Sequence, residues 1–190
     1  MQGDLMLSGS SPMQPLRIQG AVQAASLGTG SVFVQNLVAG SLQISSLEDQ
    51  TLEAVRATGS SSAISCSTNY GSIEAANIVL DKPGSWMSLN SSAGAVSLLG
   101  VSGAGNVQIE TGSDDINVEV FENGPASFSG NLYCQTGGKN LMVTGKHVEI
   151  QQSKKQNGVQ TVRAIINGEQ QGQQQMNVVS QGGDISVNIS

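Results

Sequence analysis

A short alternation of apolar and polar residues returns along the chain and opens each time with a glycine. The glycine and one small or polar residue are followed by two aliphatic residues that flank a single variable residue. This phrase begins at Gly3, Gly30, Gly40, Gly94, Gly105 and Gly183. Alternation with a period of two places aliphatic side chains on one face of a strand and polar ones on the other. The phrase therefore predicts short strands that each bury one face and are separated by glycine turns.

Further alternating segments extend this pattern to strand starts at roughly ten-residue intervals. The predicted starts are Leu5, Leu16, Val32, Leu42, Ile64, Ile73, Val96, Val107, Ile116, Leu132, Leu141, Val148 and Ile185. Such spacing is typical of sandwiches, barrels and solenoids. Because the phrase itself repeats, and because the expected core is aliphatic rather than aromatic, we predict an all-β, single-stack, β-helix-like β-solenoid. Two short Gly-cornered strands per coil correspond to about 20 residues per coil.

Two segments depart from this pattern. In residues 46–59, Ser46 could cap a helix that ends before Gly59, although the same residues could form another strand. In residues 151–181, Asn167-Gly168 follows an aliphatic run and predicts a hairpin turn, and the Gln-rich residues 170–175 predict a polar loop or the solvent side of a strand. Since no Pro/Ser-rich linker divides the chain, we predict one domain, 1–190, with 151–181 as a hairpin or an irregular insertion.

Composition and charge narrow the classes of partner. Charged residues make up 12% of the 190 residues and the net charge is −6, whereas soluble domains usually carry about 25% charged residues. The eight Lys and Arg residues form no basic stripe and aromatic residues are 3% of the chain, which argues against a nucleic-acid partner. No apolar run approaches the ~20 residues that span a bilayer. The chain shows no signal peptide, which favours an intracellular location, or an organelle if a targeting segment precedes this sequence.

The densest acidic cluster is Asp114-Asp115, with Glu110 and Glu119 nearby. A glycosidase needs two carboxylates facing one cleft, and a calcium site needs several oxygen ligands. We interpret the cluster as a solvated strand face, because the repeated glycine-aspartate pattern of calcium-binding β-rolls is missing. His147 is the only histidine, and it lacks a nucleophile motif or metal-ligand spacing around it, so we interpret it as a surface residue.

The remaining candidates also have a structural interpretation. Cys66 and Cys134 are too few for a disulfide framework and are interpreted as small buried apolar residues. Gly100–Gly105 superficially suggests a phosphate-binding loop, but another strand follows it instead of a helix, which indicates a β-turn. Trp86 and Met87 are expected to cover a corner of the core rather than stack on a ligand.

Residues Gly105–Val118 resemble the core signature of an adhesin-type β-solenoid family, a domain of unknown function. That family repeats the same glycine-cornered phrase, often followed by a Thr-Gly-Ser-Gly-Asp turn. Here Asp114 stands where that turn usually has its last glycine. The resemblance implies a β-solenoid fold and supplies no catalytic residues to transfer to this chain.

These observations predict a non-enzymatic scaffold or interaction domain that presents polar strand faces to a protein or glycan partner. No catalytic, cofactor-binding or metal residue is assigned, and no cofactor is expected. One alternative is a self-assembling filament, because the phrase runs from Gly3 to Ile189 without a polar cap, so uncapped terminal coils could associate end to end. A polysaccharide-processing β-helix enzyme is the second alternative. Asn90 and Asn188 each begin a match to the glycosylation sequon, and two matches are expected by chance in a chain this rich in Asn and Ser.

Overall fold

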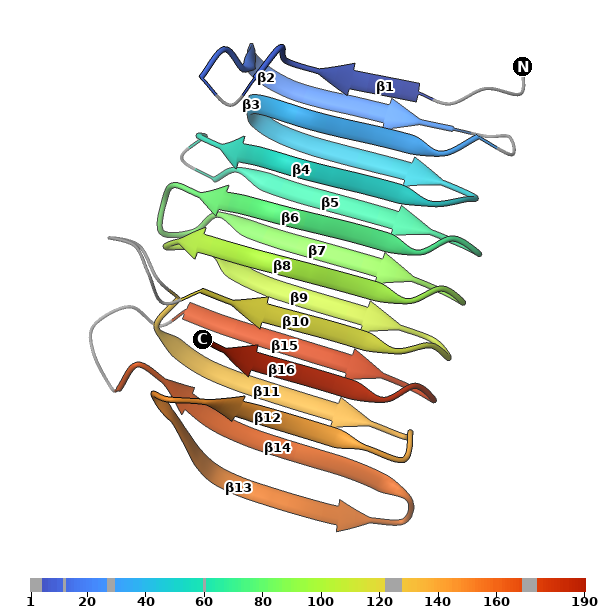
Figure 1. Ribbon diagram of the computed structural model, residues 1–190, viewed down its shortest axis with the longest axis vertical. Helices are drawn as coiled ribbons and strands as arrows, with labels where there is room; N and C mark the ends of the chain where they lie inside the picture. The colour runs from blue at the N-terminus through green and yellow to red at the C-terminus, as the bar shows by residue number, and fades with distance from the viewer. Residues whose placement is uncertain (1–4, 12, 27–29, 60, 122–127, 169–173) are drawn as a thin grey trace.

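The computed structural model describes residues 5–11, 13–26, 30–59, 61–121, 128–168 and 174–190, and these residues form sixteen strands (Figure 1). The first phrase, at Gly3-Asp4, begins outside the described residues. The strands are β1 (Leu5–Ser8), β2 (Leu16–Ala25), β3 (Val32–Ser46), β4 (Gln50–Ala57), β5 (Ala63–Thr68), β6 (Ile73–Leu80), β7 (Trp86–Ser91), β8 (Val96–Gly103), β9 (Asn106–Thr111), β10 (Ile116–Val120), β11 (Gly130–Thr136), β12 (Leu141–Gly145), β13 (Val148–Gln156), β14 (Val159–Ile166), β15 (Gln174–Ser180) and β16 (Ile185–Ile189).

All sixteen strands belong to one hydrogen-bonded sheet that folds back on itself at β3. Its order is β12-β16-β10-β8-β6-β4-β3-β5-β7-β9-β15-β11-β14-β13, and β1 and β2 both pair with β3. The long strand β3 therefore contributes to two walls. We call the β1 to β12 side, through β4, β6, β8, β10 and β16, the first wall. The second wall runs from residues 21–25 of β2 through β5, β7, β9, β15, β11 and β14 to β13, while residues 16–18 of β2 pair with the first-wall part of β3. Because both terminal strands of the order lie at the same end of the molecule, the sheet is nearly closed and barrel-like.

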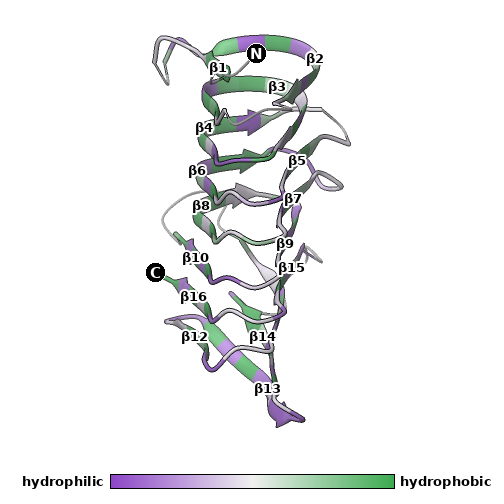
Figure 2. Cartoon of the chain, turned by 90° about the vertical axis from the view of Figure 1, so that its right-hand side faces the viewer, coloured by the Kyte–Doolittle hydropathy of each residue, from purple (hydrophilic) through white to green (hydrophobic). Residues whose placement is uncertain are grey.

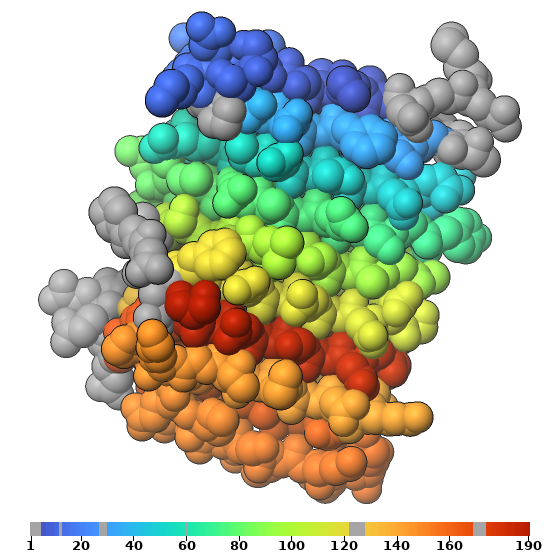
Figure 3. Space-filling model, in the orientation of Figure 1, coloured from blue at the N-terminus to red at the C-terminus, as the bar shows by residue number. Residues whose placement is uncertain are grey.

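The predicted single-stack solenoid, with about 20 residues per coil, is wrong. Val107 of β9 pairs with Met176 of β15 instead of with a strand one coil later in the chain. In the same way β16 pairs between β10 and β12, so the last strand lies inside the sheet (Figure 3). Two pairings, β11 with β14 and β14 with β13, are antiparallel. The repeated phrase specifies a turn and a one-sided strand, but it does not specify which strand becomes the neighbour.

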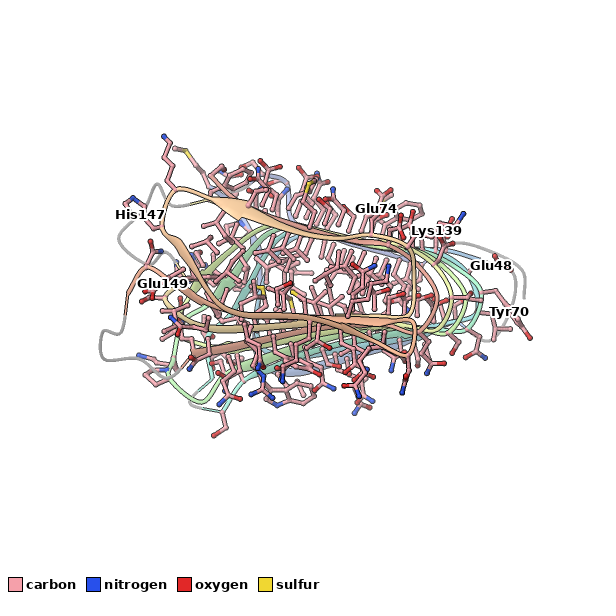
Figure 4. All side chains as sticks on the ribbon, turned by 90° about the horizontal axis from the view of Figure 1, so that it is seen from below. Glu48, Tyr70, Glu74, Lys139, His147 and Glu149 are labelled. Atoms are coloured by element: carbon pink, nitrogen blue, oxygen red, sulfur yellow. The ribbon has the colours of Figure 1, made fainter. Side chains whose placement is uncertain are left out.

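The core lies between the two walls and consists of aliphatic columns that cross the strands. On the second wall one column holds Leu42, Ile64, Met87, Val107 and Met176. All five side chains are at most 2% exposed. Figure 4 shows side chains filling the space between the walls. Each strand that is added buries further apolar surface, which stabilises the sheet by about 25 cal/mol per Å².

A line of left-handed residues bends the first wall. Asn36, Ala54, Asn77 and Gly100 have φ between 51° and 81° and occupy matching positions in β3, β4, β6 and β8. This bend shifts the alternation of buried residues, so that Leu52 and Val55, three positions apart, are both buried. The helix considered for residues 46–59 is therefore wrong, and its apolar spacing comes from a bent strand, β4.

Hydroxyl side chains and glycines stabilise the turns at the corner opposite this bend, where strands such as β5 and β7 end. Thr68 Oγ1 donates to Glu48 O (2.9 Å) and accepts the N–H of Gly71 (3.2 Å), and Ser91 repeats this pattern with Gly71 O and the N–H of Gly94. A Cβ at Gly94 would lie 2.2 Å from Gly71 O. The glycine of the repeated phrase is therefore needed because the turns of neighbouring strands stack in direct contact.

The antiparallel hairpin of β13 and β14 is closed by Asn157-Gly158. Both residues have positive φ, 50° and 82°, as a two-residue type I′ turn requires. The hairpin turn predicted at Asn167-Gly168 also has positive φ at both residues, but β14 and β15 on either side are not paired with each other. Most of the Gln-rich segment, residues 170–173, lies outside the described residues.

Candidate functional site

The acidic cluster of the sequence is distributed over a corner and two opposite faces. Asp114 and Asp115 lie in the turn before β10, where Asp115 Oδ1 accepts the N–H of Asp184 at 2.7 Å. Glu110 stands on the outside of the second wall, in β9, whereas Glu119 stands on the outside of the first wall, in β10. These carboxylates therefore do not face one cleft, and the two aspartates satisfy backbone donors of the stacked turns.

A hollow of about 670 Å³ adjoins this corner and is lined by Asp115, Lys139, Asn140, Met142 and Asp184. Asp184 is its most engaged group, since it accepts hydrogen bonds from the N–H groups of Asn140 and Lys139 and from the Asn140 side chain. These bonds, the one from the Asn140 backbone first, lower the pKa of Asp184. A carboxylate held in its charged form by donors from the protein is a turn-capping group rather than a general acid.

A second concavity, of about 330 Å³, lies along the outside of the bend and contains Arg17 and Arg56. Arg56 Nε donates to both carboxylate oxygens of Asp81 at 2.9 Å, so its charge is already neutralised. Arg17 is then the only unneutralised cation in the lining of this groove. One exposed arginine gives little discrimination between anions, so the groove supports no ligand class.

The other candidates from the sequence occupy structural positions. His147 is exposed in the turn between β12 and β13, and its carbonyl accepts the N–H of Asn167 at 2.9 Å. Figure 4 shows His147 and Glu149 at one corner, opposite Glu48 and Tyr70, with none of the four pointing into the core. Residues 100–103 are the end of strand β8 and only Ala104 and Gly105 lie between β8 and β9, so the β-turn predicted for Gly100–Gly105 is wrong for most of its length, although a strand does follow it.

Both cysteines are buried, as expected from the sequence. Cys66 and Cys134 are 1% and 0% exposed and are free thiols. They lie in the same core column of the second wall, separated by Leu89, Ile109 and Val178. Removal from water raises the pKa of each thiol to about 12. A protonated, enclosed thiol is neither a nucleophile nor a metal ligand.

The outside of the second wall from β2 to β11 is the most distinctive surface of the molecule, and we call it the polar face. It consists of the outward positions of β2, β3, β5, β7, β9, β15 and β11: Ala21, Gln23, Ala25, Ser41, Gln43, Ser45, Ala63, Ser65, Ser67, Trp86, Ser88, Asn90, Asn106, Gln108, Glu110, Gln175, Asn177, Val179, Asn131, Tyr133 and Gln135. Glu110 is the one charged residue among them. Beyond β11, the outward positions of β14 and β13 carry Arg163, Glu149 and Lys154. In side view this wall is nearly straight (Figure 2).

Hydrogen bonds between side chains run across the polar face. Gln23 donates to Gln43, and Gln108 donates to Glu110 at 2.8 Å. Two aromatic residues project from it, Trp86 with 42% of its surface exposed and Tyr133, whose hydroxyl donates to Gln135. Trp86 therefore points outward while its neighbour Met87 enters the core, so the two do not cover a corner together as predicted.

The first wall differs from the polar face in charge. Its outward positions include Glu53, Glu74 and Glu119, and Gln35 donates to Glu53 at 2.6 Å. Acidic turn residues, such as Asp49 and Asp115, line its margin. The outside of the first wall thus carries three carboxylates and Arg56, whereas the polar face carries one charged residue, Glu110.

Within the described ranges, no three His, Cys, Asp or Glu side chains gather closely enough to hold a metal ion. None of the described residues form a helix long and apolar enough to cross a membrane. Comparison with family models, with curated proteins and with solved structures finds no match for this chain. The resemblance to the adhesin-type family therefore stays a prediction.

Proposed function

We propose that this chain is a non-enzymatic interaction domain whose polar face binds a flat, uncharged surface of a protein partner. The observation that carries the proposal is the difference in charge between the polar face and the outside of the first wall. Charged residues are depleted from the centres of protein interfaces, because each buried charge must be desolvated, whereas Trp and Tyr are enriched there. The polar face has this composition, with Glu110 as its single charge, Trp86 exposed and Tyr133 half-buried.

Rigidity supports the same function. Apart from the edge strand β2, the strands of the polar face are hydrogen-bonded on both edges, and the inward side chains between the outward ones are buried aliphatics such as Leu89 and Ile109. A preorganised surface loses little conformational entropy on binding. A wall of this kind suits a scaffold that presents side chains at fixed spacings of about 4.8 Å.

A polysaccharide-processing enzyme receives less support from the same surface. Glycoside hydrolysis requires two carboxyl groups that flank one bond. The polar face carries one carboxylate, Glu110, which is already hydrogen-bonded to Gln108. The acidic residues of the first wall stand on its outward side, away from Glu110.

Two serines with matched exposure test the proposal. Ser88 lies at the centre of the polar face, and Ser97 lies at an outward position of the first wall, each half-buried. A photo-crosslinking residue at position 88 identifies the bound protein, and the affinity of that purified protein is then measured for Ser88→Arg and Ser97→Arg. We expect Ser88→Arg to weaken binding at least about ten-fold, the effect of losing about 1.4 kcal/mol at an interface. Ser97→Arg should leave the affinity within two-fold.

Two results would contradict the proposal. In the first, both arginine variants weaken binding equally, which places the interface elsewhere. In the second, no protein cross-links from position 88, while a neutral polysaccharide binds the wild-type chain and loses binding in Ser88→Arg. That outcome would assign the face to a glycan instead of a protein.

A further inference from the structure

We call the end of the sheet formed by β1 and β2 the top and the end formed by β12 and β13 the bottom (Figure 1). The edge strands at these two ends differ in charge and in regularity. A strand at the edge of a sheet exposes unpaired N–H and C=O groups and can pair with another chain. Proteins block such pairing with lysines, with bulges and with charges on the inward side of the edge strand. The presence or absence of these features therefore indicates which edge is free to associate.

Of the two bottom strands, β13 has all three protective features, whereas β12 has neither a charged residue nor a bulge. β13 contains a bulge between Ile150 and Gln152, and it carries Lys154 and Lys155. Ser153 is paired with Val162 of the core, so Lys155, two residues further on, stands on the inward side of the strand. The end of β13 is strongly hydrophilic in Figure 2. The bottom is also stepped, because the second wall extends one strand further than the first.

The top edge lacks the charges. β1 has no charged residue, and β2 has one, Arg17, which stands at the bend. β2 has its bulge between Ile18 and Ala21. Beyond that bulge, residues 21–25 pair regularly with residues 41–45 of β3 and form a straight, uncharged edge. The top is level, since both of its strands pair with β3.

The top also leaves the ends of the aliphatic columns open. Leu5, Leu7, Leu16 and Ile18 pack on the core from one side and are only partly buried. They belong to β1 and β2, so apolar surface and unpaired backbone groups are exposed together at this end. An additional strand on each wall would cover the apolar surface and pair with the free backbone groups.

We propose that the top edge is a two-fold interface with a second copy of this chain. In this arrangement β2 pairs antiparallel with β2 of the second copy, and β1 pairs with β1, so each wall continues across the interface. A two-fold axis makes the same patch serve both partners, which is the commonest form of self-association. The proposal concerns the end of the sheet and stands independently of the polar face.

The structure favours a second copy over an unrelated strand for a geometric reason. A partner must supply two strands at once, one for each wall, about 10 Å apart, and continue the aliphatic columns between them. A second copy presents β1 and β2 with this separation and with the same exposed leucines. Because the two edges are nearly uncharged, they approach without the repulsion that paired lysines would cause at the bottom.

Two lysines on the edge strand test the proposal. The variant Gln23→Lys/Ala25→Lys places like charges on the outward positions of β2, while Ser65→Lys/Ser67→Lys places them in the same two columns on the interior strand β5. Sedimentation is measured over a range of concentrations. We expect the wild-type chain, of 19.5 kDa, and the β5 variant to form dimers of twice that mass. The β2 variant should raise the dissociation constant at least ten-fold, with an unchanged circular dichroism spectrum.

A spectroscopic measurement remains informative even if the β2 lysines disturb folding. Nitroxides are attached to Gln23→Cys at the top or to Gln152→Cys at the bottom, and the native thiols do not interfere because both are buried. Dipolar coupling between copies is expected for position 23 and not for position 152. A monomer at every concentration, or coupling at position 152 alone, would overturn the proposal. So would a wild-type mass that rises beyond the dimer, since the bottom would then also associate.

Discussion

The top and the bottom are the two ends of the aliphatic columns, and they differ in the charge of the second-wall edge strand, which is β2 at the top and β13 at the bottom. At the top, Leu5 and Leu16 are covered from one side only, and β2 has one charged residue. At the bottom, Val148 and Leu141 are also partly exposed, but β13 carries Lys154 and Lys155. Apolar surface alone is therefore not what distinguishes the ends. The edge strand decides whether an open core leads to association, because its backbone groups supply the directional contacts.

Removing the lysines and the bulge of β13 should have the largest effect on self-association. Lys154→Ser and Lys155→Thr, combined with Glu149→Gln and deletion of Gln151 in the bulge, would give β13 a straight and uncharged edge. We expect assemblies that grow with concentration, as top edges pair with top edges and bottom edges with bottom edges. Light scattering measures this growth. The comparison fails if this variant keeps the same mass as the wild-type chain at every concentration.

Truncation of an isoleucine to alanine should reduce the free energy of unfolding much more in the middle of the sheet than at its end. Ile109 is 0% exposed in the centre of the second wall, whereas Ile150 of β13 is 53% exposed. Ile109→Ala should reduce the free energy of unfolding by about 2–5 kcal/mol, because it removes buried methylenes and leaves a cavity. Ile150→Ala should reduce it by less than about 1 kcal/mol. Urea unfolding provides both values, and equal losses would show that the bottom is as tightly packed as the centre.

Substitution of two glycines by alanine should show the effect of backbone conformation alone, because an added Cβ would contact no other atoms at either position. A Cβ at Gly158, in the bottom hairpin, or at Gly20, in the top strand, would have nothing within 4 Å. Gly158 has a φ of +82°, in the left-handed region, and Gly20 has no such φ. We expect Gly158→Ala to destabilise the protein by about 1 kcal/mol. Gly20→Ala should be neutral or stabilise it by about 0.4–1 kcal/mol through the unfolded chain. Thermal unfolding that ranks them in the reverse order would contradict this explanation.

The labelling rates of the two buried cysteines should measure local unfolding near the two ends of the sheet. Cys66 lies on the third strand from the top of the second wall and Cys134 on the third from the bottom. Thiol labelling requires local opening, since both side chains are buried. If the top is covered by a second copy, the labelling rate of Cys66 should fall several-fold as protein concentration rises, while that of Cys134 stays constant. Mass spectrometry of the two labelled peptides distinguishes them, and equal concentration dependence would contradict the difference between the ends.

The same thiols should make stability depend on alkaline pH. Burial raises the pKa of both from an ordinary value of 9.0 to about 12. The unfolded chain therefore releases these protons at lower pH than the folded chain. Stability should be unaffected by the thiols below about pH 9 and should fall between about pH 9 and 12. In a Cys66→Ala/Cys134→Ala variant this part of the decline should disappear, as measured by urea unfolding at each pH.

Much of the local structure could be predicted from the sequence. Strands begin at the predicted residues Leu5, Leu16, Val32, Ile73 and Ile116, because alternation and glycine turns are local signals. The interpretations of the cysteines and of His147 as structural or surface residues also agree with the structure.

Other features required the fold itself. The bend at Ala54 interrupts the alternation, since a left-handed residue shifts the phase and gives β4 the apolar spacing of a helix. Asn157-Gly158 is a dipeptide typical of hairpin turns, and it is the local sequence feature that indicates the β13–β14 hairpin. The polar face could not be assigned from the sequence, because Gln23 and Tyr133 come from segments 110 residues apart that the sheet brings to one surface.

The sequence by itself determined which residues turn, which extend and which face of each strand is buried, since these depend on neighbours within a few positions. The tertiary structure alone decided the order of the strands. A parallel pairing of β9 with β15 or of β16 with β10 joins segments about 70 residues apart, and the same aliphatic alternation would fit several partners equally well. That order places β13, with its lysines, at the bottom and β1 and β2 at the top. Whether the edge of a strand is paired depends on which strand lies beside it in the completed sheet.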